Sequence, residues 1–167
     1  MEHLWSPWRM AYLRNEDASA DPGGCIFCDL PAQNDDAKTL IVHRGRLAYV
    51  ILNRYPYNNG HMLVVPYQHV PSLENLDPAG LAEMMQLVNE TLAALRGMYG
   101  AESFNVGANI GAAAGAGIAG HVHMHVVPRW PGDTNFMTTL AATRVIPEDL
   151  QETHRLARQH WPGSAET

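Results

Sequence analysis

The pattern of hydrophobic and polar residues changes along the chain, and each change predicts a different secondary structure. From Leu40 onward, hydrophobic side chains recur with a period of two, which is typical of strands. Residues 47–53 and 61–66 are two such stretches, and residues 55–59 between them contain proline and asparagine. The Asn-Asn-Gly sequence before the second stretch tolerates the positive backbone torsions of a tight reversal. We therefore predict an antiparallel hairpin.

The pattern then changes to a helical period. Asp77 followed by Pro78 is a typical helix start, because Asp caps the N-terminus and Pro suits the first helical position. Up to about Gly97, hydrophobic residues recur at spacings of three and four, and they are Leu81, Met84, Met85, Val88, Leu92 and Leu95. This stripe predicts one long amphipathic helix, whose methionines fill the core rather than line a cofactor site.

Alternation returns at residues 121–128, which read HVHMHVVP and follow another predicted strand at residues 103–110. Successive side chains of a strand point to opposite faces, so the histidines would share one face and the apolar residues the other. A surface strand would more often use Thr, Lys or Glu, whereas imidazole suits nucleophilic attack, proton transfer or metal binding. The alternative is a half-exposed strand whose histidines have no function.

A glycine-rich stretch, residues 111–120, lies immediately upstream of these histidines and contains four glycines and no polar side chain. Glycine lets the backbone approach a ligand closely, and successive backbone amides can form a nest for an anion. An anion-binding loop beside imidazoles suggests phosphoryl or nucleotidyl chemistry.

Composition and charge narrow the class of protein. A chain of 167 residues, 46% of them hydrophobic, fits a single domain spanning residues 1–167. The net charge of −6, with Lys38 as the one lysine, argues against a nucleic-acid polymer as partner. No apolar run reaches the roughly 20 residues that span a bilayer, and the N-terminus lacks the apolar centre of a signal peptide. We therefore expect a cytoplasmic protein without a membrane partner.

The ends of the chain differ from its centre. Residues 1–24 form an aromatic-rich N-terminal arm, whose Trp5 we expect to pack on the domain or on a partner subunit. Residues 33–38 are polar and predict a surface loop. A C-terminal helix is expected over residues 147–161, and residues 162–167 form a tail.

Cys25 and Cys28 are the two cysteines of the chain, and two residues separate them. This spacing lets both thiolates reach one tetrahedral Zn²⁺, although it supplies only half of a site. In a reducing compartment a structural disulfide is not expected. A metal-free reduced pair and a redox role remain the alternatives.

Several motifs together resemble the histidine triad (HIT) superfamily of nucleotide hydrolases and transferases. The alternating histidines of residues 121–128 resemble its signature, and residues 53–66 (NRYPYNNGHMLVVP) resemble its first nucleotide-binding segment. Residues 4–13 (LWSPWRMAYL) and 128–136 (PRWPGDTNF) resemble the bacterial branch with diadenosine polyphosphate hydrolases and phosphorylases. The resemblance implies an α+β fold with a bent antiparallel β-sheet, one long helix and a C-terminal helix. It also implies a homodimer, with Trp130 as a candidate interface residue.

The resemblance assigns catalytic and binding roles. His123 would attack an α-phosphorus to form a covalent nucleotidyl-histidine, and His125 would contact the phosphates and stabilise charge in the transition state. His61 would lie near the phosphates, and Asn53 would bind the ribose hydroxyls. A core histidine or a turn-capping asparagine is the alternative at these positions. Residues 50–52 are candidates for the wall of a base pocket, although such residues are usually core.

The implied reaction is cleavage of a dinucleoside polyphosphate such as diadenosine tetraphosphate, with water or inorganic phosphate resolving the intermediate. A purine nucleoside phosphoramidase is the nearest alternative, since it uses the same chemistry with an amine leaving group. A transferase resembling galactose-1-phosphate uridylyltransferase is a weaker alternative, because this chain is short for that architecture. A nucleotide-binding regulator without catalysis is a further one.

The resemblance also completes the metal site. Zinc-containing relatives add the histidine after the second strand of the hairpin and the first triad histidine, which here are His69 and His121. With Cys25 and Cys28 they would hold a structural zinc. As a fourth catalytic candidate, His121 could instead orient the neighbouring histidine, as it does in relatives without zinc. We expect His3, His43, His154 and His160 to be ordinary surface histidines.

The chain departs from the family just before the triad. Many relatives carry Gln and Ser or Thr where this chain has Gly117 and Ile118, and the phosphorylase branch commonly has Ser at the first position. Contacts to the leaving phosphate must then come from elsewhere. We expect the backbone amides from Gly115 to Gly117, or the side chain of Asn109, to supply them.

Overall fold

The computed structural model describes residues 24–133 and 148–163, and its core is a sheet with the strand order β1-β2-β3-β5-β4. Every neighbouring pair is antiparallel. The strands are β1 Ile41–Arg44, β2 Ala48–Leu52, β3 Met62–Pro66, β4 Ser103–Gly107 and β5 Met124–Arg129. The helices are α2 Ile26–Ala32, α3 Asp36–Thr39, α4 Pro78–Tyr99 and α6 Leu150–Gln159, with 3-10 helices η1 Leu73–Asn75 and η2 Ala112–Ala114. The expected α+β fold with an antiparallel sheet is confirmed.

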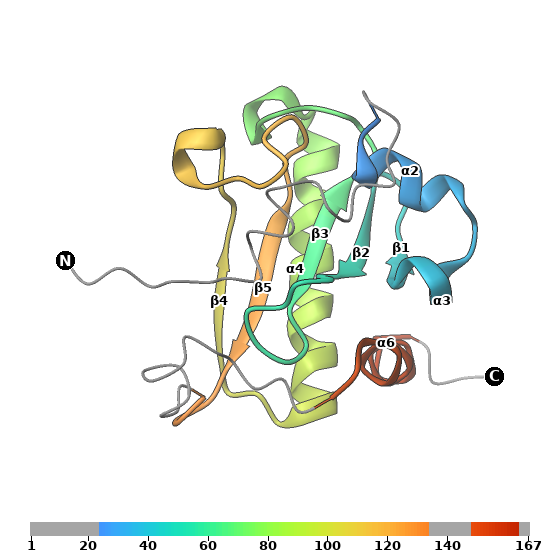
Figure 1. Cartoon of the computed structure of the whole chain (residues 1–167), viewed down its shortest axis with the longest axis vertical. Coiled ribbons are helices and arrows are strands. Elements are labelled where there is room, and N and C mark those ends of the chain that lie inside the picture. The colour runs from blue at the N-terminus through green and yellow to red at the C-terminus, as the bar shows by residue number, and fades with distance from the viewer. Residues whose placement is uncertain (1–23, 134–147, 164–167) are drawn as a thin grey trace.

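The long helix α4 runs behind the sheet across strands β2, β3 and β5 (Figure 1). The side chain of Asp77 accepts a hydrogen bond from the backbone N–H of Gly80 at 2.6 Å, which caps the first turn. The helix ends at Tyr99 rather than near Gly97, and Gly100 follows in the left-handed conformation with φ of 61°. The predicted helix is therefore confirmed, with a slightly later end.

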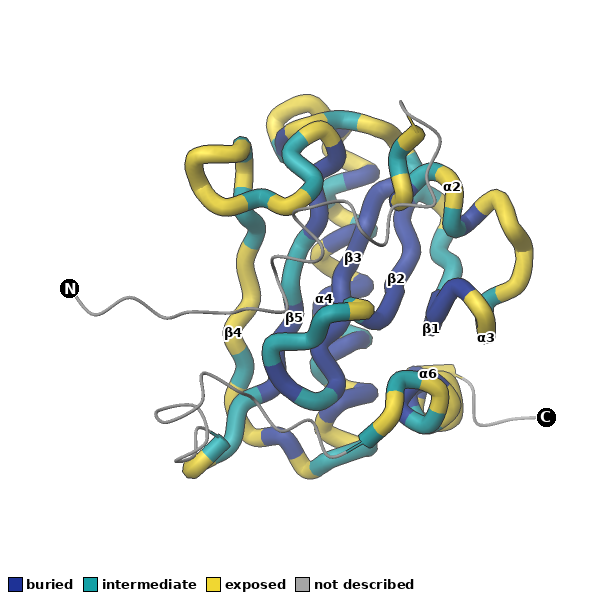
Figure 2. The backbone as a smooth tube through the Cα atoms, in the orientation of Figure 1, coloured by how far each residue is buried: buried dark blue, intermediate teal, exposed yellow. Residues whose placement is uncertain are grey.

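The predicted hairpin is the centre of the molecule. Strands β2 and β3 pair from Ala48 opposite Pro66 to Leu52 opposite Met62, and every residue of both strands is buried (Figure 2). Helix α4 packs on both strands. The buried Tyr49 hydroxyl donates a hydrogen bond to the carbonyl of Phe27 at 2.7 Å, and this bond ties α2 to the sheet.

The histidine-rich strand is shorter than predicted. Strand β5 begins at Met124, so His125 lies in the strand while His121 and His123 precede it. Its pairing with β3 stops where Val64 lies opposite Met124. Beyond that point the Val122 backbone N–H donates to the Val70 carbonyl at 2.7 Å, and the His121 ring donates a hydrogen bond to the Pro66 carbonyl at 2.8 Å. The segment before β5 is therefore held by a contact to a residue that follows β3 and by a contact to the last residue of β3.

Two short helices were missed by the sequence pattern. Helix α2 includes Pro31, and α3 replaces part of the predicted surface loop at residues 33–38. The Asp35 side chain caps α3 by accepting from the backbone N–H of Lys38 at 3.1 Å. Elements of this length contain too few turns to display a helical period, so capping and tertiary contacts define them instead.

Helix α6 covers the β1 edge of the sheet (Figure 1). Asp149 caps its first turn, so the helix begins slightly later than expected. On this helix, the expectation of a surface residue is wrong for His154, which is 5% exposed and donates a hydrogen bond to the Ile41 carbonyl at 2.8 Å. His160 is exposed as expected, whereas His43 is half-buried and stacks on Trp161.

Several expectations concern residues outside the described ranges. These are the N-terminal arm up to residue 23, which includes His3, and residues 164–167 of the C-terminal tail. Within the described ranges, no helix is both long and apolar enough to cross a bilayer. A single domain over the whole chain and a cytoplasmic location stay predictions.

Candidate active site and metal centre

The middle histidine of the triad has one ring nitrogen engaged and one available. His123 is 5% exposed, and its Nδ1 lies 2.9 Å from the backbone carbonyl of His121. A carbonyl can only accept, so Nδ1 carries the hydrogen and Nε2 keeps its lone pair. Burial lowers the pKa of His123, although the bond to the carbonyl opposes this. The ring is therefore neutral at pH 7 and suited to nucleophilic attack through Nε2.

His61 and His125 form a hydrogen-bonded pair beside His123. The Nε2 of His61 lies 2.9 Å from the Nδ1 of His125. The Nδ1 of His61 accepts the backbone N–H of Tyr57 at 3.1 Å, so the His61 hydrogen sits on Nε2 and is donated to His125. Burial, with smaller contributions from His125 and His123, lowers the pKa of His61 to about 3.

These rings form one continuous group. The ring centroids of His123 and His125 are 5.0 Å apart, and those of His61 and His125 are 5.2 Å apart. Tyr57 stacks on the His125 ring with an interplanar angle of 14°. The structure thus brings together three of the four histidines expected to be catalytic, whereas the His121 ring points toward the cysteines.

Phe27 was not singled out from the sequence. Its ring centroid lies 4.8 Å from that of His123 and 5.5 Å from that of His121, so it packs against both. The residue sits between the two cysteines of the CxxC sequence, and this position was the available signal. Helix α2 therefore follows Cys25, carries Cys28, and packs through Phe27 against His121 and His123.

Asn53 is anchored within the hairpin turn. Its side-chain oxygen accepts the backbone N–H of Tyr55 at 2.9 Å, as a turn-capping asparagine does. Its Nδ2 lies 3.2 Å from the Nδ1 of His61. The turn-capping alternative is thus present in the structure, and contact with a ribose stays a prediction.

The glycine-rich loop contains backbone that suits close approach, but part of it is already bonded. Gly111 and Gly115 have φ of 82° and 86°. The amide of Gly115 donates to the Ala112 carbonyl at 3.0 Å, so in this conformation it is engaged within η2. Ile118 packs partly against the core, which explains an apolar residue there. Binding roles for Asn109, Gly115 and Gly117 stay predictions.

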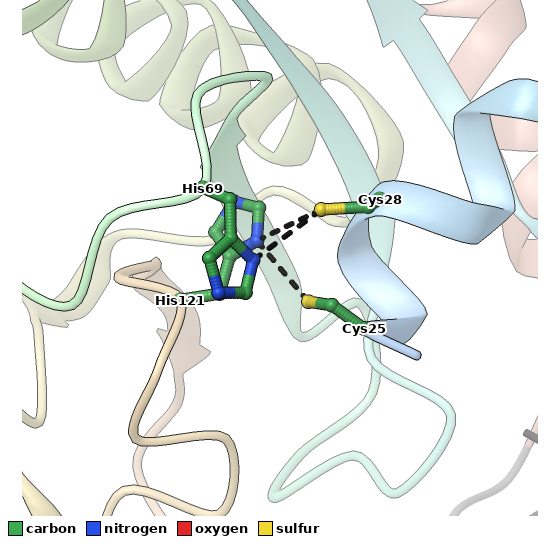
Figure 3. Close-up of side chains that lie close together, drawn as sticks. All are labelled: Cys25, Cys28, His69 and His121. Carbon is green, nitrogen blue, oxygen red and sulfur yellow. Dashed lines mark hydrogen bonds between the residues drawn. The ribbon is translucent and has the colours of Figure 1, made fainter. Parts of the chain in front are cut away.

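Four side chains from three parts of the chain converge at the other end of the triad (Figure 3). The sulfur of Cys25 lies 3.2 Å from the Nδ1 of His121, and that of Cys28 lies 3.4 Å from the Nδ1 of His69. One ligand atom of each residue lies within 4.8 Å of those of the others. The Nε2–H of His121 is used by Pro66, which leaves Nδ1 free to bind a metal.

The donor set fits a metal ion. Two sulfurs and two imidazole nitrogens at these separations match a tetrahedral site. Burial is the main factor that raises the pKa of the Cys28 thiol to about 11, and Cys25 raises it further. A bound cation would offset that cost, because metal binding displaces the thiol protons. These four residues can hold a metal ion.

Comparison with known proteins finds relatives over most of the chain. A family model described as HIT domain matches residues 34–132. The chain is 41% identical over 166 residues to a protein of Mycobacterium tuberculosis named AP-4-A phosphorylase, covering 96% of this chain and 85% of that protein. It is 32% identical over 136 residues to Adenylylsulfatase HINT3 of Arabidopsis thaliana, covering 74% of this chain and 68% of that protein.

A solved structure is also similar. It is titled a Zn-bound histidine triad family protein from Mycobacterium smegmatis and superposes with a TM-score of 0.67 at 31% identity, covering 82% of this chain and 92% of that one. The HIT model spans more than half of the chain, and the M. tuberculosis relative aligns with nearly all of it. The chain belongs to the histidine triad family.

Proposed function

We propose that this protein cleaves dinucleoside polyphosphates, such as diadenosine tetraphosphate, through a covalent nucleotide on His123. The observation that carries the proposal is the fixed tautomer of His123, whose Nδ1–H is held by the His121 carbonyl while Nε2 keeps its lone pair. The relative named AP-4-A phosphorylase supports the substrate class.

The reaction has two steps. First, the Nε2 lone pair of His123 attacks an α-phosphorus, and the P–O bond to the rest of the polyphosphate breaks, so that ATP leaves from diadenosine tetraphosphate. His125 lies next to this ring and supplies positive charge or a hydrogen bond to the phosphates. Second, an acceptor attacks the same phosphorus, the P–N bond breaks and His123 is restored.

We propose inorganic phosphate as the acceptor, on the similarity to the phosphorylase. Under this proposal phosphorolysis does not require the serine that the phosphorylase branch commonly has at this position, because the chain has Gly117 there. Purified protein would be incubated with diadenosine tetraphosphate, with and without phosphate, and the nucleotides separated. ADP plus ATP formed only with phosphate is the expected result. AMP plus ATP in both samples would replace phosphate by water, and no turnover would overturn the substrate class.

A second candidate is cleavage of adenylyl compounds with a single phosphorus. The relative named Adenylylsulfatase HINT3 favours it, and the histidine group could perform the same attack. Adenosine 5′-phosphoramidate and adenylyl sulfate would be compared with diadenosine tetraphosphate by kcat/KM. A higher kcat/KM for either of them would make this candidate the main function.

We propose that Cys25, Cys28, His69 and His121 hold a structural zinc. The Cys₂His₂ donor set and the Zn-bound structural relative support it. Elemental analysis of protein purified without added metal should find about one zinc per chain. Another metal, or none in a folded and active protein, would overturn the proposal.

We also propose a homodimer that joins two sheets at strand β4. This strand lies at the end of the sheet, and Val106 on it is 42% exposed. Light scattering should give twice the chain mass of 18.4 kDa for the wild type. Val106→Lys should give the monomer mass if the β4 edge is the interface. Trp130 and the aromatic arm remain predicted contributors.

A further inference from the structure

A polar cluster outside the triad anchors the hairpin turn to the far end of β5. Asn58 is 9% exposed, and its Nδ2 donates to the Pro128 carbonyl at 3.0 Å and to the Asp133 carboxylate at 2.9 Å. Arg129 donates to the same carboxylate from Nε at 2.6 Å and from its terminal nitrogen at 3.0 Å. The Asp133 side chain is 7% exposed, so the carboxylate that accepts these bonds lies largely out of water, whereas the Arg129 side chain is 39% exposed.

The anchored turn leads directly to the histidine pair. Tyr57 precedes Asn58, and its backbone N–H donates to the Nδ1 of His61 at 3.1 Å. The Nδ2 of Asn53 faces the same nitrogen at 3.2 Å, and its orientation is set by the bond from Tyr55. With two donors aimed at it, Nδ1 of His61 cannot carry a hydrogen without a clash.

These contacts define which ring nitrogen carries the hydrogen in both His61 and His125. His61 must carry its hydrogen on Nε2, which lies 2.9 Å from the Nδ1 of His125. The Nδ1 of His125 therefore accepts, and a neutral His125 carries its own hydrogen on Nε2. A donor at Nε2 is the form that can give a hydrogen bond, or a proton, to an oxygen of the phosphate chain.

We propose that Asn58 and Asp133 are positioning residues for the reaction: they hold the turn so that the Tyr57 amide keeps His61 and His125 in the tautomers that present the His125 Nε2–H. The order of hydrogens stands on geometry alone. Its catalytic use rests on the proposed function, because it requires a phosphate-containing substrate next to His123.

The tautomers of His61 and His125 can be measured independently of turnover. Imidazole ¹⁵N resonances of uniformly labelled protein at neutral pH report which ring nitrogen carries the hydrogen, with His61 and His125 assigned through single substitutions. In the wild type, both should carry it on Nε2. In Asn58→Ala and in the isosteric Asp133→Asn, we expect a mixture of tautomers for His61 and His125.

Kinetics with diadenosine tetraphosphate supply the second readout. Both variants should lose about 10- to 100-fold in kcat, part of the roughly 10²–10⁴-fold that acid–base catalysis contributes, with KM changed by less than about twofold. Glu152→Gln is the matched control, because Arg155 contacts Glu152 through two nitrogens as Arg129 contacts Asp133, but on the exposed face of α6. It should change neither readout.

Each outcome decides a different statement. If Asn58→Ala and Asp133→Asn melt earlier yet keep the wild-type tautomers and kcat, the cluster is only structural and the proposal fails. A wild-type His61 with its hydrogen on Nδ1 would also overturn it, whatever the activity. If the wild type has the expected tautomers but turns over no dinucleoside polyphosphate, the proposed function fails while the tautomer order stands. Should Asn58→Ala not fold, Asp133→Asn and the wild-type spectrum still decide.

Discussion

The two sides of His123 are organised by different physical means. On one side, His121 faces the sulfurs of Cys25 and Cys28, at separations that suit a metal ion. On the other, His125 accepts a hydrogen bond from the buried, neutral His61. The first side, called the metal side below, can hold an ion and would then depend on charge. The hydrogen-bonded side depends on which nitrogen of each neutral ring carries the hydrogen.

The two sides contact His123 in different ways, one through a hydrogen bond to its Nδ1 and the other through its ring. The Nδ1–H of His123 donates to the His121 carbonyl, so the residue that faces the two cysteines also orients the proposed nucleophile. The His125 ring, 5.0 Å away by centroid, lies beside the nucleophile without holding it. Damage to the metal side should therefore misplace the nucleophile, whereas damage to the other side should leave it in place and impair the handling of charge.

The largest effect is expected where the two sides meet. His123→Asn removes the attacking nitrogen, so kcat with diadenosine tetraphosphate should fall by about 10⁴-fold or more. Nucleotide binding, measured by calorimetry with a nonhydrolysable analogue, should persist because the flanking groups remain. His160→Asn on an exposed histidine is the control and should retain full activity. Wild-type kcat in His123→Asn would assign the attack to another residue.

Breaking the metal side should affect both stability and activity. Cys28→Ser replaces one of the four clustered ligands, and we expect a loss of about 3 kcal/mol, or roughly 10 °C in melting temperature for a chain of this length. Calorimetry with parallel elemental analysis would measure it. Wild-type protein treated with a chelator should reproduce the loss, and Cys28→Ser should be insensitive to chelator. A variant that melts like the wild type would mean that no metal contributes to stability.

The sequence predicted the elements and the histidines of this site, but not all the contacts that arrange them. The hairpin and α4 could be predicted from local patterns, because the alternation of hydrophobic and polar residues and the Asp77-Pro78 helix start involve only residues close together in the chain. The family resemblance named His61, His123 and His125, and the structure places their rings together. The sequence did not predict the interruption of the histidine-rich strand, where His121 and Val122 bond to Pro66 and Val70, which lie about 50 positions earlier in the chain.

The supporting contacts were missed for the same reason. Asn58 and Asp133 are 75 positions apart, and no periodicity relates them. Asp133 lies in the PRWPGDTNF motif and Asn58 in the hairpin motif, so the sequence marks both segments but not the contact between them. Phe27 lies in a helix too short to show a period. Local rules identify elements and motifs, whereas tertiary contacts decide which of their residues meet.

The hydrogen-bonded side should respond to acid. The folded-state pKa of His61, about 3, lies below the ordinary value of 6.5, so the unfolded chain binds more protons between these values. Stability from this group is therefore present above pH 6.5 and declines as the pH falls from about 6.5 to about 3. Urea unfolding across this range should show a shallower decline for His61→Gln than for the wild type, with His160→Gln as control. Equal slopes would show that His61 is not held neutral.

The smallest expected effect separates the ring of Tyr57 from its backbone amide. Tyr57→Ala keeps the N–H that bonds to His61 but removes the ring stacked on His125 at a centroid distance of 5.8 Å. Since an aromatic contact of this kind is worth about 0.5–1.5 kcal/mol, kcat/KM should fall by about two- to tenfold, and Tyr57→Phe should restore it. Steady-state kinetics would measure both variants, with the imidazole tautomers unchanged. A loss as large as that of Asn58→Ala would mean that the ring, rather than the amide, holds the histidine pair.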